Sequence, residues 1–452
     1  LKEKNLFSLI KSEQFYDAKE NQFLADRYIS GDCPVCDAKD AYGDQCESCG
    51  STLSPEELIN PKSTISGNTP ILKKTTHWYL PMQKHEAWLK EWIETGIIEG
   101  KKQHDPKKWK SHVLGQCKSW LNAGLQERAM TRDLNWGVQV PLKNAEGKVL
   151  YVWLDAPIGY ISATKEWANE NNKDWEKYWK NPKTKLINFI GKDNIVFHCI
   201  IFPIILKEHG EYILPNNVPS NEFLNLEGKK ISTSRNHAIW VHEYINNFPN
   251  KVDVLRYVLC SISPESKDSD FTWKDFQARN NNELVAIFGN FVNRVIVLTN
   301  KYWDGIIPKL NELSEKDQIT ISETTSFAEK IGYSIENYKF REGLFELMNL
   351  ARLGNKYLAE NEPWKLIKID SKKTETILNI SLQIVYKLAI LSQPFLPTIS
   401  KNLSELLNYK LSDWDSAKKE INLRAGHKIN TAKHLFEIIS DEQINKEIEK
   451  LK

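Results

Sequence analysis

Four cysteines near the N-terminus are the strongest candidates for chemistry in this sequence of 452 residues. Cys33 and Cys36 form one Cys-x-x-Cys pair, and Cys46 and Cys49 form a second pair after an interval of nine residues. Four thiolates held in two such turns can surround Zn²⁺ tetrahedrally, and a shell of four sulfurs leaves no position for a catalytic water. The spacing therefore predicts one structural zinc site, with a metal-free knuckle as the alternative.

A basic segment rich in hydroxyl groups is the second candidate. It runs over Glu227–Arg235 and contains two lysines and three hydroxyl side chains, namely Lys229, Lys230, Ser232, Thr233 and Ser234. Ammonium and hydroxyl groups can stabilise the charge on a pyrophosphate leaving group. The spacing is not that of a Walker loop. Because most basic loops are only solvated, this segment alone does not decide a function.

Short apolar runs indicate the elements that position these residues. Val149–Leu154, Lys185–Ile190 and Glu222–Leu226 each stop at small or charged residues, which is typical of buried parallel strands that carry site residues at their C-terminal ends. Helical spacing intervenes at Asp155–Asn169 and Val196–Glu208. We expect an α/β fold for this part of the chain.

The pattern changes near residue 275, where the strand signals stop. Long amphipathic stretches follow, at Asn281–Trp303, Thr325–Tyr338, Gly343–Ala359 and Thr376–Leu391. They predict an all-α bundle. The charged segment Asp441–Lys452 has a helical pattern and is expected to be an arm or the start of a linker.

Composition limits the classes of protein that this chain can belong to. Hydrophobic residues make up 41% and charged residues 27%, so the chain can bury a core, and the net charge of +2 restricts any nucleic-acid surface to a local patch. The most apolar run, Ile195–Leu206, is interrupted by His198 and Pro203 and is shorter than the roughly 20 residues of a membrane span. Without a signal peptide pattern and with clustered cysteines, the sequence predicts a cytoplasmic protein that does not enter a membrane.

Several stretches together resemble the class I aminoacyl-tRNA synthetases, and methionyl-tRNA synthetase in particular. They are Thr131–Gly137, Tyr151–Tyr160, Phe189–His198 and Lys230–Ser234, the last of which resembles the Lys-Met-Ser-Lys-Ser sequence of that class. The resemblance extends to about residue 440, and the cysteine pairs fit the family's insertion between the two halves of its nucleotide fold. It implies a partial class I Rossmann fold (α/β) with a zinc-knuckle insertion, followed by an all-α anticodon-binding helical bundle.

The resemblance also implies a division into five parts. These are a zinc-knuckle insertion (1–130), the second half of the catalytic fold (131–222), a signature-loop and stem-contact region (223–275), an anticodon-binding domain (276–415), and a C-terminal arm or linker (416–452).

Residues that match the family's substrate positions can be named one by one. The resemblance places five side chains around the methionine side chain, namely Trp153, Ala156, Pro157, Tyr160 and His198. It places Gly191 and Asp193 at the ribose of the adenylate, and Lys230, Ser232 and Ser234 at the ATP phosphates. From the residues alone, other roles stay open: core packing for the aromatic side chains, a helix cap for Asp193, and a buried structural histidine at position 198.

A separate group in the predicted bundle matches the positions with which this family reads the methionine anticodon. Asn290 and Arg294 lie one helical turn apart, and Trp364 follows Pro363 at an expected helix start. An indole can stack on an unpaired base while Arg and Asn form hydrogen bonds with base edges. A surface ion pair, a polar helix face and a core indole are the ordinary alternatives.

Two departures from the family pattern limit the expected activity. None of the ten histidines takes the His-x-Gly-His spacing of the class, and the chain begins with Leu1 rather than Met, so we expect a fragment that lacks the half of the nucleotide fold carrying that sequence. Thr233 stands where the family usually has its second lysine, and Lys229 and Arg235 are candidates to compensate for the lost charge.

The expected function is that of a methionine–tRNA ligase, with ATP and Mg²⁺ as co-substrate, one structural Zn²⁺, and L-methionine and tRNA(Met) as further partners. A monomer is expected for this chain. The alternatives are a tRNA-binding module that is catalytically incomplete, and a class I ligase for another amino acid, which the combination of Asn290, Arg294 and Trp364 disfavours.

Overall fold

The computed structural model describes residues 1–43, 46, 53–233 and 235–451. The chain divides into two compact units, Leu1–Ser220 and Asn221–Lys452. Within the described residues, no helix combines the length and the apolar character that a membrane span requires.

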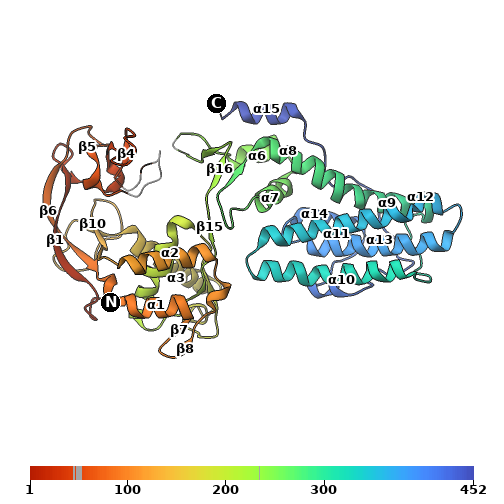
Figure 1. Cartoon of the computed structure of the whole chain (residues 1–452), viewed down its shortest axis with the longest axis horizontal. Helices are drawn as coiled ribbons and strands as arrows, with labels where there is room; N and C mark the ends of the chain where they lie inside the picture. The colour runs from red at the N-terminus through yellow and green to blue at the C-terminus, as the bar shows by residue number, and fades with distance from the viewer. Residues whose placement is uncertain (44–45, 47–52, 234, 452) are drawn as a thin grey trace. The chain divides into compact units, whose positions relative to one another are not determined.

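A pair of long antiparallel strands organises the first part of unit 1 (Figure 1). β1 (Ser8–Asp17) pairs with β6 (Ile71–Leu80), and these strands form the centre of a sheet whose order is β2-β1-β6-β9. The edge strands are β2 (Gln22–Phe23) and β9 (Arg128–Ala129). Between β1 and β6 the chain folds into a second small sheet.

That small sheet, which contains β4 and β5 in Figure 1, has the order β4-β3-β5. The cysteine cluster lies beside it. Its strands are β3 (Ile29–Asp32), β4 (Ala41–Tyr42) and β5 (Ile59–Ser63). Leu24, Ile29 and other side chains form a small core of their own beside it. A core of this size offers little apolar burial, so the region gains from a metal or another covalent or ionic constraint.

Helices and short strands alternate in the rest of unit 1. The helices are α1 (Glu86–Thr95), α2 (Ser111–Ala123), α3 (Val152–Glu170), α4 (Glu176–Trp179) and α5 (Phe202–His209), and the strands are β7 (Ile97–Ile98), β8 (Lys101–Lys102), β10 (Thr131–Asp133), β11 (Lys148–Leu150), β12 (Leu186–Ile187), β13 (Ile190–Gly191), β14 (Pro215–Asn217) and β15 (Ser220–Asn221). β12 pairs in parallel with β14, which confirms the parallel strand expected within Lys185–Ile190.

The expectation of a parallel strand at Val149–Leu154 is wrong. β11 ends at Leu150 and pairs antiparallel with β10, and α3 begins at Val152. The reason is that a short apolar run fits a strand and the buried face of a helix equally well. Here Leu154, Pro157 and Ile161 recur at helical spacing and are buried in the core.

Unit 2 begins with a three-stranded sheet of order β17-β16-β18 (Figure 1). β16 (Leu224–Leu226) pairs antiparallel with β17 (Lys229–Lys230) and in parallel with β18 (Ser269–Phe271). β16 confirms the strand expected within Glu222–Leu226. β18 is the last strand that the described residues form, as the change of pattern near residue 275 predicts.

An all-helical region follows, so the predicted fold class is confirmed. The helices of unit 2 are α6 (Val241–Asn247), α7 (Val252–Ser261), α8 (Trp273–Arg279), α9 (Asn290–Trp303), α10 (Glu315–Glu336), α11 (Phe340–Asn361), α12 (Pro363–Leu366), α13 (Ser371–Leu391), α14 (Pro397–Leu406) and α15 (Asp441–Glu449), with a π-helical segment, Asn280–Gly289, between α8 and α9. α13 is the central helix, because every residue from Ile377 to Leu391 is buried against its neighbours.

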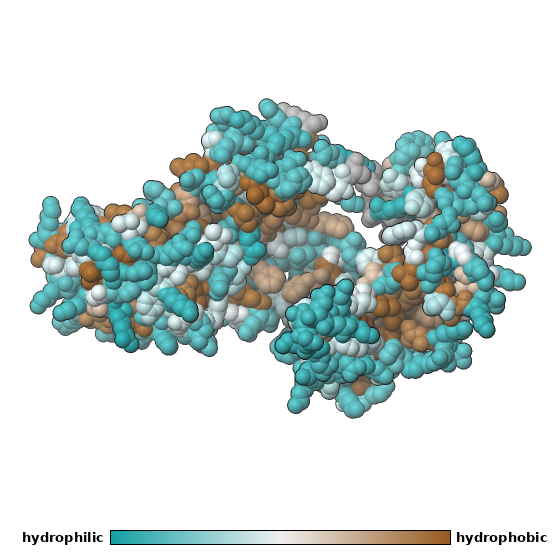
Figure 2. Space-filling view, turned by 180° about the vertical axis from the view of Figure 1, so that it is seen from behind, coloured by the Kyte–Doolittle hydropathy of each residue, from teal (hydrophilic) through white to brown (hydrophobic). Residues whose placement is uncertain are grey.

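The packing of α11 against α9 depends on a glycine. A Cβ atom on Gly354 would overlap the ring of Phe291, so only glycine lets these two helices approach so closely. On the face shown in Figure 2, the surface of the helical region is mostly hydrophilic, with scattered hydrophobic side chains.

Candidate functional site

Three of the four predicted zinc ligands are brought together by the sheet β4-β3-β5. Cys33 directly follows β3, Cys36 lies in the turn after it, and Cys46 comes after β4. The three Sγ atoms lie within 4.8 Å of one another, and the Sγ atoms of Cys36 and Cys46 are 3.7 Å apart. Cys49 lies outside the described residues.

These distances fit zinc. Sulfur atoms about 2.3 Å from a tetrahedral Zn²⁺ are about 3.8 Å from one another, which agrees with the separation of Cys36 and Cys46. Cys33 and Cys46 are buried and Cys36 is exposed, so the cluster lies at the edge of its small core. A fourth thiolate from the second pair would complete the shell.

The residues expected around methionine lie on α3 and on the segment that follows β13. Trp153, Ala156 and Tyr160 are three and four residues apart on α3 and so share a face, whereas Pro157 is buried beside Leu154. The hydroxyl group of Tyr160 is 3.0 Å from Nε2 of His198. Two of the five predicted residues are therefore in direct contact. Ala156 is exposed and Pro157 is buried on the same helix.

The hydrogen bonds of His198 define its tautomer. Nδ1 lies 3.0 Å from the carbonyl oxygen of Asn194, which can only accept, so Nδ1 carries the proton. Nε2 then accepts a hydrogen bond from the hydroxyl group of Tyr160. Burial lowers the pKa of His198 below its usual value, with the Asn194 carbonyl acting in the opposite sense. The ring is therefore neutral at neutral pH, which suits an apolar thioether neighbour.

His198 and Phe197 belong to a π-helical segment, Phe197–Ile201, directly before α5. The ring of Phe197 stacks on Trp153, with centroids 4.2 Å apart and planes inclined by 11°. On the same ring, the guanidinium group of Arg128 lies 5.1 Å from the centroid. The ring of Phe197, which also contacts the cation of Arg128, therefore holds the indole of Trp153 in place.

Tyr151 extends this arrangement. Arg132 lies 4.2 Å from the centroid of its ring and Arg128 lies 5.4 Å from it, and Arg128 also donates a hydrogen bond of 3.0 Å to its hydroxyl oxygen. Arg132 is itself fixed, because its Nη1 donates to the carbonyl oxygens of Ala129 and Thr131. The two guanidinium groups thus hold Tyr151, the residue directly before α3.

Asp133 secures the adjoining strands β10 and β11. Burial alone would raise its pKa, but hydrogen bonds from His77, Lys148 and Thr75 lower the pKa to about 2. Lys148 comes from β11 and the other two donors come from β6. The ionised carboxylate of Asp133 on β10 is therefore bonded to both β6 and β11.

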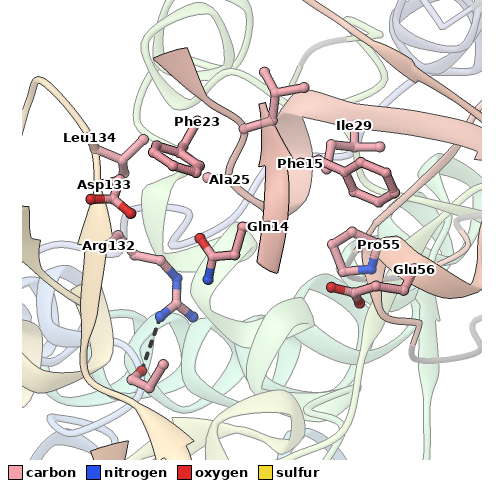
Figure 3. Close-up of a pocket in the computed structure, with 12 residues that line it drawn as sticks. Gln14, Phe15, Phe23, Ala25, Ile29, Pro55, Glu56, Arg132, Asp133 and Leu134 are labelled. Carbon is pink, nitrogen blue, oxygen red and sulfur yellow. Dashed lines mark hydrogen bonds between the residues drawn. The ribbon is translucent and has the colours of Figure 1, made fainter. Parts of the chain in front are cut away.

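Two cavities adjoin Arg132. The larger one, of about 810 Å³, is lined by residues of the segments 25–28, 132–138 and 149–155, Trp153 among them. The smaller one, of about 100 Å³, is shown in Figure 3 with Gln14 and Glu56 in its wall. Arg132 lies between them, and the dashed line in Figure 3 marks its hydrogen bond to Ala129.

The residues expected at the adenylate ribose lie at the end of β13. Gly191 is the last residue of that strand, and Asp193 is exposed in the 3-10 turn that follows. A Cβ atom on Gly191 would lie 2.9 Å from Oδ1 of Asp193, so a larger residue at position 191 would displace this carboxylate. The N-cap of the turn is Gly191, so Asp193 does not occupy the cap position that was its alternative role.

The predicted phosphate loop belongs to unit 2, and hydrogen bonds hold it at both of its ends. β16 and β17 are joined by Glu227 and Gly228, both with positive φ, and the amide of Gly228 donates to both carboxylate oxygens of Asp270. Lys229 and Lys230 are exposed on β17.

Beyond β17, Ser232 and His237 exchange backbone hydrogen bonds of 2.9 Å. Nε2 of His237 is 2.9 Å from the carbonyl oxygen of Leu226 and so anchors the loop on β16. Thr233 and Arg235 are exposed within the turn, and Ser234 lies outside the described residues. The loop therefore presents its basic and hydroxyl groups from a fixed hairpin.

Two of the three predicted anticodon residues are in contact. The guanidinium group of Arg294, on α9, lies 4.7 Å from the centroid of the Trp364 ring, and Trp364 is only partly buried. Pro363 is the first residue of α12, as expected. Asn290 is exposed one turn before Arg294 on α9. The three side chains can thus offer a stacking surface with hydrogen-bond donors and acceptors beside it.

Sequence reasoning assigned no role to Phe197, Arg128 or Tyr151, although these residues hold Trp153. Their contacts join residues up to 69 positions apart and depend on a π-helical turn that leaves no recognisable periodicity. The only available signal was that Phe197 precedes His198 and that Tyr151 begins the matched stretch.

Comparison with known proteins places these features in a family. The model for class I tRNA synthetases (M) matches residues 1–296, and the model for the anticodon binding domain of methionyl tRNA ligase matches residues 307–452. A methionine–tRNA ligase of Christiangramia forsetii is 59% identical over 97% of this chain, and one of Bacteroides fragilis is 57% identical over 100% of it. The chain spans 64% and 65% of the lengths of these two relatives.

Solved structures share the fold. The methionyl-tRNA synthetase of Mycobacterium tuberculosis in complex with methionyl-adenylate has a TM-score of 0.75 at 19% identity, covering 96% of this chain and 78% of that chain. The apo form of the Mycobacterium tuberculosis protein has a TM-score of 0.73 at 18% identity, covering 97% and 79%. The sequence matches and the site geometry lead to one conclusion: the chain belongs to the methionyl-type class I tRNA synthetase family.

Proposed function

We propose that the protein containing this chain is a methionine–tRNA ligase, which activates L-methionine with ATP and transfers it to tRNA(Met). One observation carries the proposal: identity of 57% and 59% to methionine–tRNA ligases runs through both units of the chain. The activity of the whole protein is a proposal because the chain spans 64% to 65% of the length of those relatives.

The methionine side chain binds against the face of α3. Trp153 and Pro157 supply apolar contacts, Ala156 leaves space, and Tyr160 and His198 form the polar end of the site. A polarisable thioether suits aromatic walls, and the neutral His198–Tyr160 pair avoids burying a charge beside it. The stack of Phe197 on Trp153 supports this assignment because it fixes the indole in one orientation.

In the first reaction, the carboxylate of methionine attacks the α-phosphate of ATP in line, and pyrophosphate leaves with Mg²⁺. Gly191 and Asp193 bind the ribose, and Lys230, Ser232 and Ser234 stabilise the charge on the leaving group. The exposed lysine on the fixed hairpin β16–β17 supports the role of Lys230. No covalent bond to the protein forms, so positioning and electrostatics supply the rate enhancement.

In the second reaction, a terminal hydroxyl group of tRNA(Met) attacks the mixed anhydride and AMP leaves. Asn290, Arg294 and Trp364 recognise the anticodon, and the contact between Arg294 and Trp364 supports their shared role.

We assign the parts of the chain as 1–130 for the zinc-knuckle insertion, 131–222 for catalysis, 223–275 for the signature loop, 276–415 for the anticodon and 416–452 for an arm. The proposal includes a monomer that acts in the cytoplasm, with Zn²⁺ held by Cys33, Cys36, Cys46 and Cys49.

Methionine-dependent exchange of pyrophosphate into ATP tests the first reaction in the full-length protein. Exchange with methionine and not with other amino acids is the expected result. Exchange that depends on another amino acid would overturn the substrate assignment, and no exchange at all would overturn the ligase assignment.

A second candidate function is a tRNA-binding module without catalysis. Two observations favour it for this chain on its own: the class sequence His-x-Gly-His does not occur in the 452 residues, and Thr233 replaces a lysine. The same exchange assay on residues 1–452, combined with binding of an anticodon stem-loop, distinguishes the two. Binding without exchange supports the module, whereas exchange by this chain alone contradicts it.

A further inference from the structure

The carboxylate of Asp270, on β18, holds the turn of the hairpin β16–β17, directly before Lys229 and Lys230. The amide of Gly228 donates to both of its oxygens, with nitrogen–oxygen distances of 2.9 and 3.0 Å. Hydrogen bonds to a charged acceptor are roughly twice as strong as bonds between neutral groups. The contact spans 42 positions of the sequence, so it connects the turn to a strand outside the hairpin itself.

The segment that carries Asp270 holds the same turn at two further points. The amide of Glu227 donates to the carbonyl oxygen of Phe271 at 2.9 Å, and the carboxylate of Glu227 accepts a 2.8 Å bond from the amide of Trp273. The side chains of Phe271 and Trp273 are buried in the core of unit 2. Three contacts therefore connect the turn to a rigid base.

This support matters because the hairpin is short. β17 consists of Lys229 and Lys230 and lies at the edge of its sheet, where it pairs with β16. A two-stranded hairpin is at best marginally stable by itself. The turn adds strain, since Glu227 has a φ of +47°, which is unfavourable for a residue other than glycine. Contacts from outside the hairpin are therefore needed to keep the two lysines in one place.

A carboxylate at this place needs a reason, because a negative charge near Lys229 and Lys230 weakens their attraction for phosphate groups. Both oxygens of Asp270 are engaged by the amide of Gly228, so the carboxylate acts as a hydrogen-bond acceptor that fixes the backbone. Under the proposed function, Lys230 stabilises the charge on the leaving pyrophosphate. Stabilisation of this kind depends on exact placement, and a displacement of about 1 Å can cost about 100-fold in rate.

We propose that Asp270 is a positioning residue for adenylate formation: by holding the amide of Gly228, it places Lys230 at the pyrophosphate leaving group. The inference rests on the proposed function and extends it to a residue that acts through the hairpin rather than on the substrate. Its effect on the reaction therefore requires the lysine that it positions.

The first test measures methionine-dependent pyrophosphate exchange in the full-length protein. Asp270→Ala is expected to lower kcat by about 10- to 100-fold, the size of one hydrogen bond with a charged group, and to leave the KM for methionine within about twofold of wild type. In a Lys230→Ala background, the same substitution should lower kcat by less than about twofold further, because the positioned lysine is gone. A purely structural residue would lower kcat by the same factor in both backgrounds.

Two further variants separate hydrogen bonding from charge and from general effects on the sheet. Asp270→Asn keeps an acceptor oxygen and loses the charge, and it should retain at least about a third of the wild-type kcat. Asp268→Ala is the matched control, because the Asp268 carboxylate accepts a 2.8 Å bond from the amide of Phe223, at the opposite end of β16. It should leave kcat within about twofold of wild type.

Hydrogen–deuterium exchange at the Gly228 amide tests the contact without any assay of activity. Loss of the acceptor in Asp270→Ala should speed exchange at this amide by about 10-fold or more, whereas Asp268→Ala should leave it unchanged. Mass spectrometry of peptides covering residues 224–231 measures the rate in the full-length protein.

Four results overturn the inference: a kcat of Asp270→Ala within about twofold of wild type, an equal loss in the Lys230→Ala background, a loss in Asp270→Asn as large as in Asp270→Ala, or unchanged hydrogen exchange at Gly228. The third would show that the charge of Asp270 matters rather than its hydrogen bond. The proposed function fails separately, if the wild-type protein shows no methionine-dependent pyrophosphate exchange, and hydrogen exchange at Gly228 then still decides whether Asp270 holds the turn.

Discussion

His198 has both ring nitrogens engaged, one by the carbonyl of Asn194 and the other by the hydroxyl of Tyr160. A protonated imidazole has two donors and no acceptor, so protonation would break the bond from Tyr160. Burial lowers the pKa of His198 and thus opposes that change. Proton uptake at one ring atom therefore controls the shape of the expected methionine site.

The pH dependence of methionine binding follows from this arrangement. The folded-state pKa of His198 lies below its unfolded value of about 6.5, so the unfolded state binds the proton first, and the stability present above that pH is lost as the pH falls. We expect the KM for methionine in pyrophosphate exchange to stay constant from about pH 8 down to about pH 6.5 and to rise only at lower pH, where the pH passes through the lowered pKa of the folded His198. His198→Gln should weaken binding at all pH values and abolish this rise; an identical rise in the variant would contradict the assignment.

Sequence alone could identify Tyr160 and His198 only through a family pattern, because their contact joins residues 38 positions apart. The role of Phe197 in holding Trp153 could not be predicted at all. The π-helical turn that aligns Phe197 with Trp153 belongs to a buried core that also contains residues of α2 and α3, and no local pattern records such long-range packing.

Among the elements, α13 buries an amine. Lys387 is fully buried, and its Nζ donates a hydrogen bond of 3.0 Å to Oγ1 of Thr324 on α10. Burial lowers the pKa of Lys387 to about 8, with Glu420 acting weakly in the opposite sense. A charged amine at this place therefore costs free energy at neutral pH.

Replacing this lysine should stabilise the helical unit. Between about pH 8 and the unfolded value of about 10.4, the unfolded state binds the proton and the folded state does not, so wild-type stability rises with pH. Lys387→Met is expected to raise the free energy of unfolding at pH 7 by about 1–3 kcal/mol and to flatten its rise between pH 8 and 10. Chemical denaturation at several pH values measures both effects.

Lys365→Met is the matched control, because Lys365 is an exposed lysine of the same unit paired with Glu362. It should change the unfolding free energy by no more than about 0.5 kcal/mol. An equal free energy of unfolding for Lys387→Met and wild type at pH 7 would show that the buried amine does not destabilise the folded state.

The sheet β4-β3-β5 is the second element with a measurable consequence. Its small core and the spacing of its thiols predict that Zn²⁺ supports its fold. Cys36→Ser should lower the zinc content from about one per chain to a small fraction of that, as measured by atomic emission. Cys260→Ser, in unit 2, should leave the zinc content unchanged. Full zinc retention by Cys36→Ser would remove this residue from the ligand set.

Periodicity predicted the long helices well, because their apolar faces persist over several turns, as in α11 and α13. It was wrong at Val149–Leu154, where too few residues distinguish a strand from the start of α3. Of the cysteine cluster that the spacing predicts, the described residues confirm that Cys33, Cys36 and Cys46 come together.

At the scale of the whole chain, two units divide at Ser220 and Asn221. The sequence pattern changes near residue 275 instead. The difference arises because the sheet β17-β16-β18 packs with the helices: Leu226, Phe271 and Trp273 belong to the same buried core as the bundle. Tertiary packing of this kind is not visible in local hydropathy.

Because the chain forms two units, a substitution in one unit is expected to impair the step that depends on that unit and to spare the other step. Trp364→Ala in the full-length protein should weaken tRNA charging by about 1–3 kcal/mol through lost stacking and leave pyrophosphate exchange nearly unchanged. Steady-state charging and exchange assays measure the two effects. Tyr333→Ala, which removes a 62% exposed aromatic side chain from α10, should affect neither. Equal losses of charging and exchange in Trp364→Ala would contradict the anticodon assignment.

The close crossing at Gly354 has a consequence for decoding. Phe291 fills the space that a methyl group at position 354 would take, and Arg294 follows Phe291 by one turn on the same helix. Any larger side chain at 354 would shift that helix and pull the guanidinium group away from the Trp364 ring. Under the proposed function, the position of a guanidinium group that recognises the anticodon would then depend on the absence of a side chain at residue 354, in the interior of the bundle.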